Sequence, residues 1–450
     1  MNASPGRGAQ SSVNFGELPL NKFVKRLTIL SAMGVFLDGY DLTIISVALL
    51  FIKPQFHPSP AALGMVGSAA VVGMLFGSLI FGNLTDRFGR KAMYLLDLLF
   101  FVVFALLTAV SQNMTELIIF RFLLGIGLGA DYPISSTMTA EFAPNRKRGI
   151  LMVTTIAFWT VGAIVSYGVS LLLLHTGPNA WRYMLASGAI PALLVIWGRR
   201  SIPESPRWLA ASGQTDRAME VAQKIASDAG HTLNTEDHGL GEAPKNRLAS
   251  FLTLFRRDLI AMTIFASLGW LLFDIGNYAT IVFSPTIFKM LKGATMTSSV
   301  LASMTMQAFG LVGIALVWLL VDRIGRKWIQ SVGFLMLGIV FIVTGLLKHP
   351  AFGLFLLLFI LLSIVDQGPG QLTYVYAGEV FPTSVRATGH GFATAASRVG
   401  ALLGISAVPL FISTVGLSPA LVVFGIIDLL GFGLTVWLAP EPKGKSLPTD

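Results

Sequence analysis

Long apolar runs separated by short polar connections make up most of the chain. Each run is long enough to cross about 30 Å of hydrocarbon as a helix. Because the runs lack the strict apolar–polar alternation of barrel strands, they predict an all-α membrane protein with twelve transmembrane helices. The runs cover residues 27–51, 62–84, 92–111, 117–140, 150–174, 182–202, 259–288, 298–321, 328–347, 351–380, 388–412 and 417–438.

One long polar and charged stretch, residues 203–258, follows the sixth run. It predicts a linker that carries one or two short surface helices around 215–227. We therefore expect three parts: an N-terminal six-helix bundle over 1–202, a cytoplasmic linker over 203–258 and a C-terminal six-helix bundle over 259–450.

The composition indicates that lipid is the natural solvent of this chain. Only 12% of its residues are charged, whereas about a quarter are charged in a soluble protein, so its surface could not be covered with polar groups. Basic connections between helices then account for the net charge of +9, and we expect no nucleic-acid partner. Because cysteine is absent, a disulfide framework and a thiolate metal site are excluded, and we expect neither a metal nor a cofactor.

The basic residues predict the orientation. If the N-terminus is cytoplasmic, 25 of the 32 Lys and Arg residues lie in the terminal and even-numbered connections. This bias places both termini in the cytoplasm of a cell, inner or plasma, membrane. The polar residues 1–25 lack the pattern of a removable signal peptide, so we expect the first helix to direct insertion.

The two halves repeat each other at a nearly constant offset. Asp86-Arg87-Phe88-Gly89-Arg90-Lys91 returns 236 residues later as Asp322-Arg323-Ile324-Gly325-Arg326-Lys327, and Pro203-Glu204 returns as Pro440-Glu441. Three further pairs at 236 to 238 are Glu141 with Glu379, Asp38 with Asp274, and Pro133 with Pro369. These pairs indicate a duplicated bundle, which is the architecture of many secondary transporters that rock around a midplane site.

The basic loop motifs predict a gate. Their glycine permits a tight turn, and their aspartate can cap a helix or pair with a nearby arginine. Such a charged latch can break and reform as the halves move, although a stop-transfer charge cluster is the simpler alternative. We assign the gate to Asp86, Arg87, Gly89, Arg90, Glu141, Asp322, Arg323, Arg326 and Glu379.

These motifs, together with Pro203-Glu204-Ser205-Pro206-Arg207-Trp208 and the closing Pro440-Glu441-Pro442, resemble those of the major facilitator superfamily. The resemblance covers nearly the whole chain. It implies two six-helix domains, alternating access without ATP, and a transporter rather than an enzyme. No nucleophile–base pair or metal cluster in the sequence supports an enzyme.

Within the superfamily, the chain is most similar to the phosphate:proton symporters. Asp38-Gly39-Tyr40-Asp41-Leu42 resembles their first-helix signature, and Trp270, Asp274 and Tyr278 match their seventh-helix pattern Trp-x-x-x-Asp-x-x-x-Tyr. Arg398 falls where that family tends to have lysine. Trp159 and Gly370 depart from the pattern, because they replace the glutamine and the asparagine that hold phosphate. A tryptophan suits an organic or aromatic anion better than it suits phosphate.

Several ionisable residues lie near mid-membrane by their depth in the runs, and each is a functional candidate because charge is costly there. Trp270, Asp274 and Tyr278 are spaced four apart, so they form one stripe that can hold a polar solute or simply pack. The substrate-binding candidates are Tyr132, Trp159, Trp270, Asp274, Tyr278 and Arg398.

The proton-coupling candidates are Asp38, Asp41 and Asp131. A low-dielectric medium favours the neutral form of a carboxyl group, so any of them could take a proton from one side and release it on the other. The alternative is a structural pair, such as Asp131 with Arg398. We expect Arg121 to be structural or an outer gate, and Asp97 to belong to the loop latch.

The leading hypothesis is a monomeric, proton-coupled symporter for a small anion, with inorganic phosphate first and an organic or aromatic acid second. Its partners would be that anion, protons and the lipid bilayer. A nutrient sensor that binds without transport is the alternative from another class.

Overall fold

The computed structural model describes residues 12–13, 20–142, 148–233, 251–382 and 385–441. Some side chains within these ranges are also outside the description. Four of the predicted site residues are affected, namely Asp86, Tyr132, Glu141 and Asp322.

Long helices dominate the structure, as the apolar runs predict. The first half contains α1 (Lys22–Phe56), α2 (Pro60–Phe88), α3 (Arg90–Val110), α4 (Met114–Phe142), α5 (Arg148–Leu173), α6 (Ala180–Ser187) and α7 (Ala189–Arg199). The second half contains α11 (Ile260–Lys289), α12 (Met296–Ile324), α13 (Arg326–Leu346), α14 (Phe352–Val365), α15 (Gln367–Glu379), α16 (Arg386–Thr414) and α17 (Leu417–Leu438). Between them lie α8 (Pro206–Ala211) and α9 (Thr215–Asp228), and β1 (Ser12–Val13) pairs in parallel with β2 (Thr232–Leu233).

Twelve spans result from these helices. Eleven segments of the described chain are long and apolar enough to cross a membrane, with α6 and α7 forming one of them and α14 and α15 another. The twelfth is α4, which is 29 residues long and carries Arg121 and Asp131. The predicted all-α fold with two six-helix bundles is confirmed.

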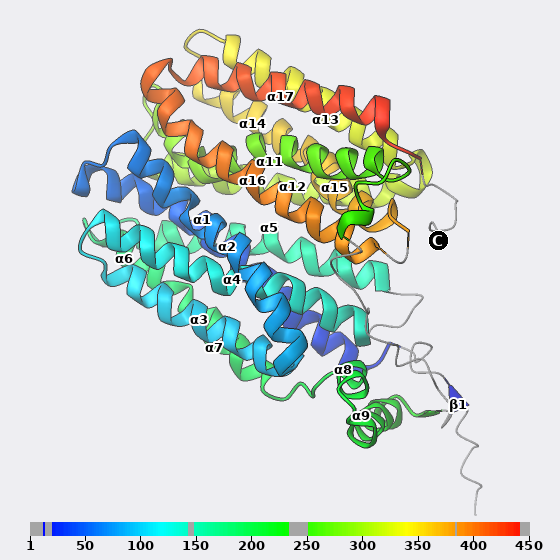
Figure 1. Ribbon diagram of the computed structural model, residues 1–450. Coiled ribbons are helices and arrows are strands. Elements are labelled where there is room, and N and C mark those ends of the chain that lie inside the picture. The colour runs from blue at the N-terminus through cyan, green and yellow to red at the C-terminus, as the bar shows by residue number, and fades with distance from the viewer. Residues whose placement is uncertain (1–11, 14–19, 143–147, 234–250, 383–384, 442–450) are drawn as a thin grey trace, which may run out of the picture.

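The two bundles lie side by side, with α1 to α7 in the lower part of Figure 1 and α11 to α17 in the upper part. Helices α8 and α9 lie at one end of the molecule, which we call the linker side, and the turn between α1 and α2 lies at the opposite end, the far side. Corresponding helices pack alike, because α1 packs on α5 as α11 packs on α16.

Glycines allow helices to touch through their backbones in both halves, in the α2–α4 pair and in the α11–α16 pair. A Cβ atom at Gly125 would collide with the carbonyl oxygen of Ala70, and one at Gly129 with that of Met74. The α11–α16 pair repeats this arrangement, because a Cβ atom at Gly404 would collide with the carbonyl oxygen of Ile275. Small residues are the usual means of close helix packing in lipid, where the hydrophobic effect does not drive helices together.

The two halves meet at the far side. Ser406 of α16 donates a hydrogen bond to the Ser68 hydroxyl of α2 over 3.1 Å, and the Tyr167 and Ser284 hydroxyls, from α5 and α11, are also 3.1 Å apart. All four residues lie in the far-side parts of their helices. The far side is therefore closed in this conformation.

A valine at Gly129 should destabilise the protein. The added side chain meets backbone atoms of α2, which cannot move aside as a flexible side chain can, so we expect a loss of about 1–3 kcal/mol in the free energy of unfolding. The matched control is Gly433→Val in α17, where no atom lies within 4 Å of the added Cβ. Thermal unfolding in detergent measures both variants, and equal midpoints would contradict the packing argument.

Candidate functional site

Adjacent residues of α16 engage the predicted stripe on α11. Ser397 donates a hydrogen bond to the Asp274 carboxylate over 2.5 Å, and Arg398 donates one to the Tyr278 hydroxyl, also over 2.5 Å. Asp274 is only 2% exposed. The structure thus brings together Asp274, Tyr278 and Arg398, three of the predicted substrate-binding residues.

Trp270, the third member of the stripe, has different surroundings. Its indole packs edge-on against the rings of Tyr374 and His390, each with a centroid distance of 6.0 Å. This aromatic group lies one helical turn from Asp274, toward the linker side. Trp270 is half-buried, so part of its surface is accessible.

Asp38 reaches the same cluster from the other half of the molecule. It is 2% exposed, and neither of its oxygens accepts a hydrogen bond of standard geometry. Its polar neighbours are the indole of Trp159 and the guanidinium of Arg398. Arg398 also acts electrostatically on Asp274, so one arginine lies within electrostatic range of both repeat-related carboxyl groups.

Asp41 is held by a different arginine. The Asp41 carboxylate pairs with Arg121 at 3.1 Å, and Arg121 also donates to the carbonyl oxygen of Val66. The Arg121 side chain is completely buried. Of the two roles expected for Arg121, this geometry supports the structural one.

Asp131 pairs with Arg199, which lies at the end of α7. The Arg199–Asp131 distance is 2.5 Å, and Asp97 of α3 lies 3.7 Å from the same guanidinium nitrogen. The suggested pair between Asp131 and Arg398 is therefore wrong. The expectation that Asp97 belongs to the loop latch is also wrong, because its carboxylate belongs to this buried cluster.

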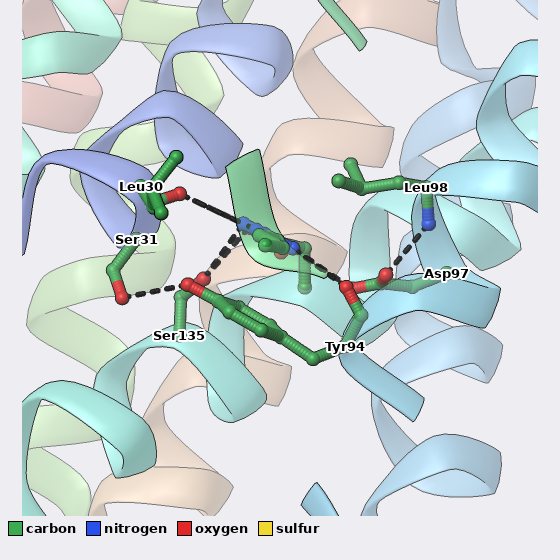
Figure 2. A network of polar contacts seen from close by, with 8 residues as sticks. Leu30, Ser31, Tyr94, Asp97, Leu98 and Ser135 are labelled. Carbon is green, nitrogen blue, oxygen red and sulfur yellow. Dashed lines mark hydrogen bonds and ion pairs between the residues drawn. The ribbon is translucent and has the colours of Figure 1, made fainter. Parts of the chain in front are cut away.

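The Arg199 guanidinium is surrounded by acceptors from three helices (Figure 2). It donates to the carbonyl oxygens of Leu30 and Tyr94 and to the Ser135 hydroxyl, at 3.1 to 3.2 Å, and it stacks over the Tyr94 ring at 3.5 Å. Gly34 makes room for it, since a Cβ atom there would collide with both charged groups. The network therefore ties α7 to α1, α3 and α4.

Both basic loop motifs are held by a distant glutamate. Glu204 accepts hydrogen bonds from the backbone nitrogens of Arg90 and Lys91, at 3.0 and 3.2 Å, and so caps the start of α3. Glu441 caps α13 in the same way, accepting from Arg326 at 3.1 Å and from Lys327 at 3.0 Å.

The glycine of each motif has the conformation that the tight turn requires. Gly89 and Gly325 have φ angles of 100° and 102°, which favour glycine over other residues. Arg326 also pairs with Glu379 at 3.6 Å. Arg87 and Arg323 are exposed.

Comparisons with known proteins agree with this architecture. The family model for the sugar (and other) transporters matches residues 27–449. The chain belongs to the sugar (and other) transporter family. It is therefore a member of the major facilitator superfamily and an integral membrane transporter.

The curated relatives of this transporter align over nearly its whole length. It is 32% identical to the inner membrane metabolite transport protein YgcS of Escherichia coli, over 99% of this chain and 96% of the relative. The repressible high-affinity phosphate permease of Neurospora crassa is 28% identical, over 95% and 86%. The solved structure of the E. coli xylose transporter XylE, in a partially occluded inward-open conformation, has the same fold, with a TM-score of 0.80 at 22% identity over 94% of this chain and 100% of XylE.

The sequence does not predict two features of the transporter. Arg199 lies at the end of the sixth apolar run, where a basic residue at the membrane surface is expected, yet it is fully buried, whereas its neighbour Arg200 is exposed. The signal was present, since Ala192, Val195 and Arg199 fall on one helical face and all are buried. The capping role of Glu204 and Glu441 was also missed, although both glutamates follow the repeat offset.

Replacing Arg199 with Met should destabilise the transporter strongly. Asp131 and Asp97 would remain buried without their cation, and breaking a buried pair in this way costs about 3–5 kcal/mol. Arg200→Met is the matched control, since an exposed substitution changes stability by about 0.5 kcal/mol or less. Thermal unfolding of the purified variants measures the difference, and similar midpoints for the two would show that the network does not hold the bundle.

Proposed function

We propose that this transporter is a proton-coupled symporter for a small organic acid, with Arg398 as the contact for the anion and Asp38 as the proton site. The observation that carries the proposal is the sharing of Arg398 by Asp38 and Asp274 across the two halves. A guanidinium has five N–H donors in a planar fork, which suits a carboxylate.

The charges of this cluster explain how the two fluxes are coupled. With both aspartates ionised, the cluster carries one net negative charge, which repels an anion. A proton on Asp38 removes that charge and releases Arg398 from one of its two carboxylate neighbours. A bound proton then raises the affinity for the anion, and by thermodynamic reciprocity a bound anion raises the affinity for the proton by the same factor.

Among the three candidate carboxyl groups, Asp38 is best suited to carry the proton. Asp41 and Asp131 are each paired with a buried arginine, at 3.1 and 2.5 Å. Removing either charge would leave that arginine unbalanced in the membrane interior. Asp38 has no hydrogen bond of standard geometry to lose, so its proton can come and go at the smallest structural cost.

The side chains near the cluster favour an organic anion over phosphate. Trp159 lies beside Asp38, and a Cβ atom at Gly370 would lie 3.1 Å from the Phe273 ring, so aromatic surface stands where the phosphate pattern has two amides. Phosphate needs several polar donors, whereas an organic acid has an apolar body that can pack against rings. This reverses the order of substrates that the sequence favours.

Inorganic phosphate is the second candidate. The Trp270, Asp274 and Tyr278 stripe supports it, as do relatives such as the phosphate permease of Neurospora crassa. The arabinose-proton symporter of Bacillus subtilis, 31% identical over 94% of each chain, supports proton coupling but carries a neutral sugar by name. Arabinose is therefore a useful neutral comparison in uptake experiments.

Alternating access would expose the cluster to each side in turn. The halves are in contact at the far side, at Ser68 with Ser406 and at Tyr167 with Ser284. If the basic linker side is cytoplasmic, as the charge bias predicts, this conformation is closed toward the outside. Rocking of one bundle against the other would open those contacts while the glutamate-capped loops approach each other.

Asp38→Asn should abolish proton-driven accumulation without abolishing exchange. We expect uptake into proteoliposomes under an inward proton gradient to fall about tenfold or more, because the variant cannot release and regain the proton. Counterflow with substrate on both sides should persist. The surface variant Asp258→Asn, whose side chain is 66% exposed, is the control. Gradient-driven uptake by Asp38→Asn at the normal rate would refute the proton site.

Arg398→Gln should remove uptake of the anion, and Arg398→Lys should retain part of it, because a lysine keeps the charge but not the fork. A screen of aliphatic acids, aromatic acids, phosphate and arabinose, first by thermal shift and then by uptake, identifies the class. Trp159→Gln is the matched probe, and we expect it to shift the preference toward phosphate. Normal arabinose uptake by Arg398→Gln would show that the substrate is not an anion, and binding without any uptake would indicate a sensor.

A further inference from the structure

A polar cavity lies inside the C-terminal half, on a different face of α11 from Asp274. It measures about 20 Å³, enough for one water-sized particle. The apolar part of its wall includes Phe273, Leu337 and Phe341. Its oxygen-bearing side chains are Asn277, Thr280, Gln307, Ser363, Asp366 and Asp428, which come from α11, α12, α14, α17 and the junction of α14 with α15.

Three polar atoms of this cavity have no hydrogen-bond partner. They are Oδ2 of Asp428, Nε2 of Gln307 and Oγ of Ser363. These residues are 2%, 5% and 3% exposed. Buried polar groups in folded proteins are nearly always satisfied, so three unsatisfied atoms around one cavity indicate a missing polar occupant.

The acids of the cavity favour a positively charged occupant. Asp366 acts electrostatically on Asp428, and among the described residues no Lys, Arg or His is given as an electrostatic partner of either. The acids of the N-terminal half differ, because Asp41 and Asp131 each have an arginine. Two uncompensated carboxyl groups in the membrane interior are costly, and a cation between them would remove much of that cost.

We propose that this cavity binds a sodium ion. Carboxylate, amide and hydroxyl oxygens are the ligands of hard cations, and six of the described lining side chains carry them, against one thioether, that of Met306, and no imidazole. We assign a monovalent ion on coordination rather than on size. Mg²⁺ keeps several waters, for which the cavity is too small, and Ca²⁺ takes six to eight oxygens. One oxygen of Asp366 is already occupied, since it accepts a hydrogen bond from Gln367 at 2.6 Å.

The geometry gives the ion a structural effect on α11. Gly276 lies beside the carboxylate of Asp428, since a Cβ atom there would be 3.8 Å from Oδ2 of that residue. Ligands from Asn277 and Thr280 on the same helix would connect α11 to α12, α14 and α17 through the ion. Sodium would therefore stabilise the C-terminal half, whatever solute binds at the central cluster, which comprises Asp38, Asp274 and Arg398.

Thermal unfolding of the purified full-length protein tests this site. We expect the midpoint without substrate to be higher in sodium chloride than in choline chloride of equal ionic strength, by about 3 °C or more. Binding of radioactive sodium should show one ion per chain. Asp428→Asn should abolish both effects, whereas Asp274→Asn, a buried acid of α11 outside the cavity, should retain them.

Two neutral substitutions keep the test decisive if Asp428→Asn does not fold. Gln307 would bind the ion through Oε1, with its amide turned so that Nε2 no longer faces the cavity. Ser363→Ala and Gln307→Met then each remove one uncharged ligand and should weaken sodium binding several-fold. Equal midpoints in sodium and choline, or a sodium effect that survives all three cavity variants, would overturn the proposal. A larger shift with Ca²⁺ or Mg²⁺ would overturn the choice of a monovalent ion. None of these outcomes bears on the central cluster, which is judged by uptake in Asp38 and Arg398 variants.

Discussion

A charged side chain in the hydrocarbon interior costs about 3 kcal/mol even on insertion scales, so each one needs a partner or a function. The described part of this transporter meets the requirement in three ways. Asp41 and Asp131 are neutralised by buried arginines within one bundle. Asp38 and Asp274 share Arg398 across the two bundles. Asp366 and Asp428 face a cavity instead of a basic residue.

The first of these arrangements stabilises the fold, whereas the second can serve transport. Arg199 and Arg121 each collect several acceptors within the N-terminal bundle and tie its helices together. An arginine between the bundles is different, because its two carboxyl neighbours belong to parts that would move relative to each other in the proposed alternating access. Only such a group can change its balance of charges when the halves rock, and this is the physical reason to place proton and anion binding there.

The duplication explains why the molecule is symmetric at its edges and asymmetric at its centre. Glu204, which caps α3, and Glu441, which caps α13, make nearly the same hydrogen bonds, because both loops must hold a helix start against a tight turn. The interiors of the two halves have no shared structural requirement of this kind. The N-terminal half uses ion pairs where the C-terminal half uses hydroxyls, amides and a cavity, so each half can have its own ligands while the frame remains shared.

The sequence by itself determined the twelve spans, the repeat and the stripe from Trp270 to Tyr278. Spans follow from hydropathy because every backbone polar group in lipid must be satisfied within its own helix, and a stripe follows from helical spacing. The partners of the charges were decided only by tertiary structure. Asp131 pairs with Arg199, 68 residues away, because Gly34 leaves space between α1 and α4, and Arg199 resembled a flanking charge at the end of its run. An ion pair depends on which helix faces meet, and that information is not contained in the hydropathy of any single span.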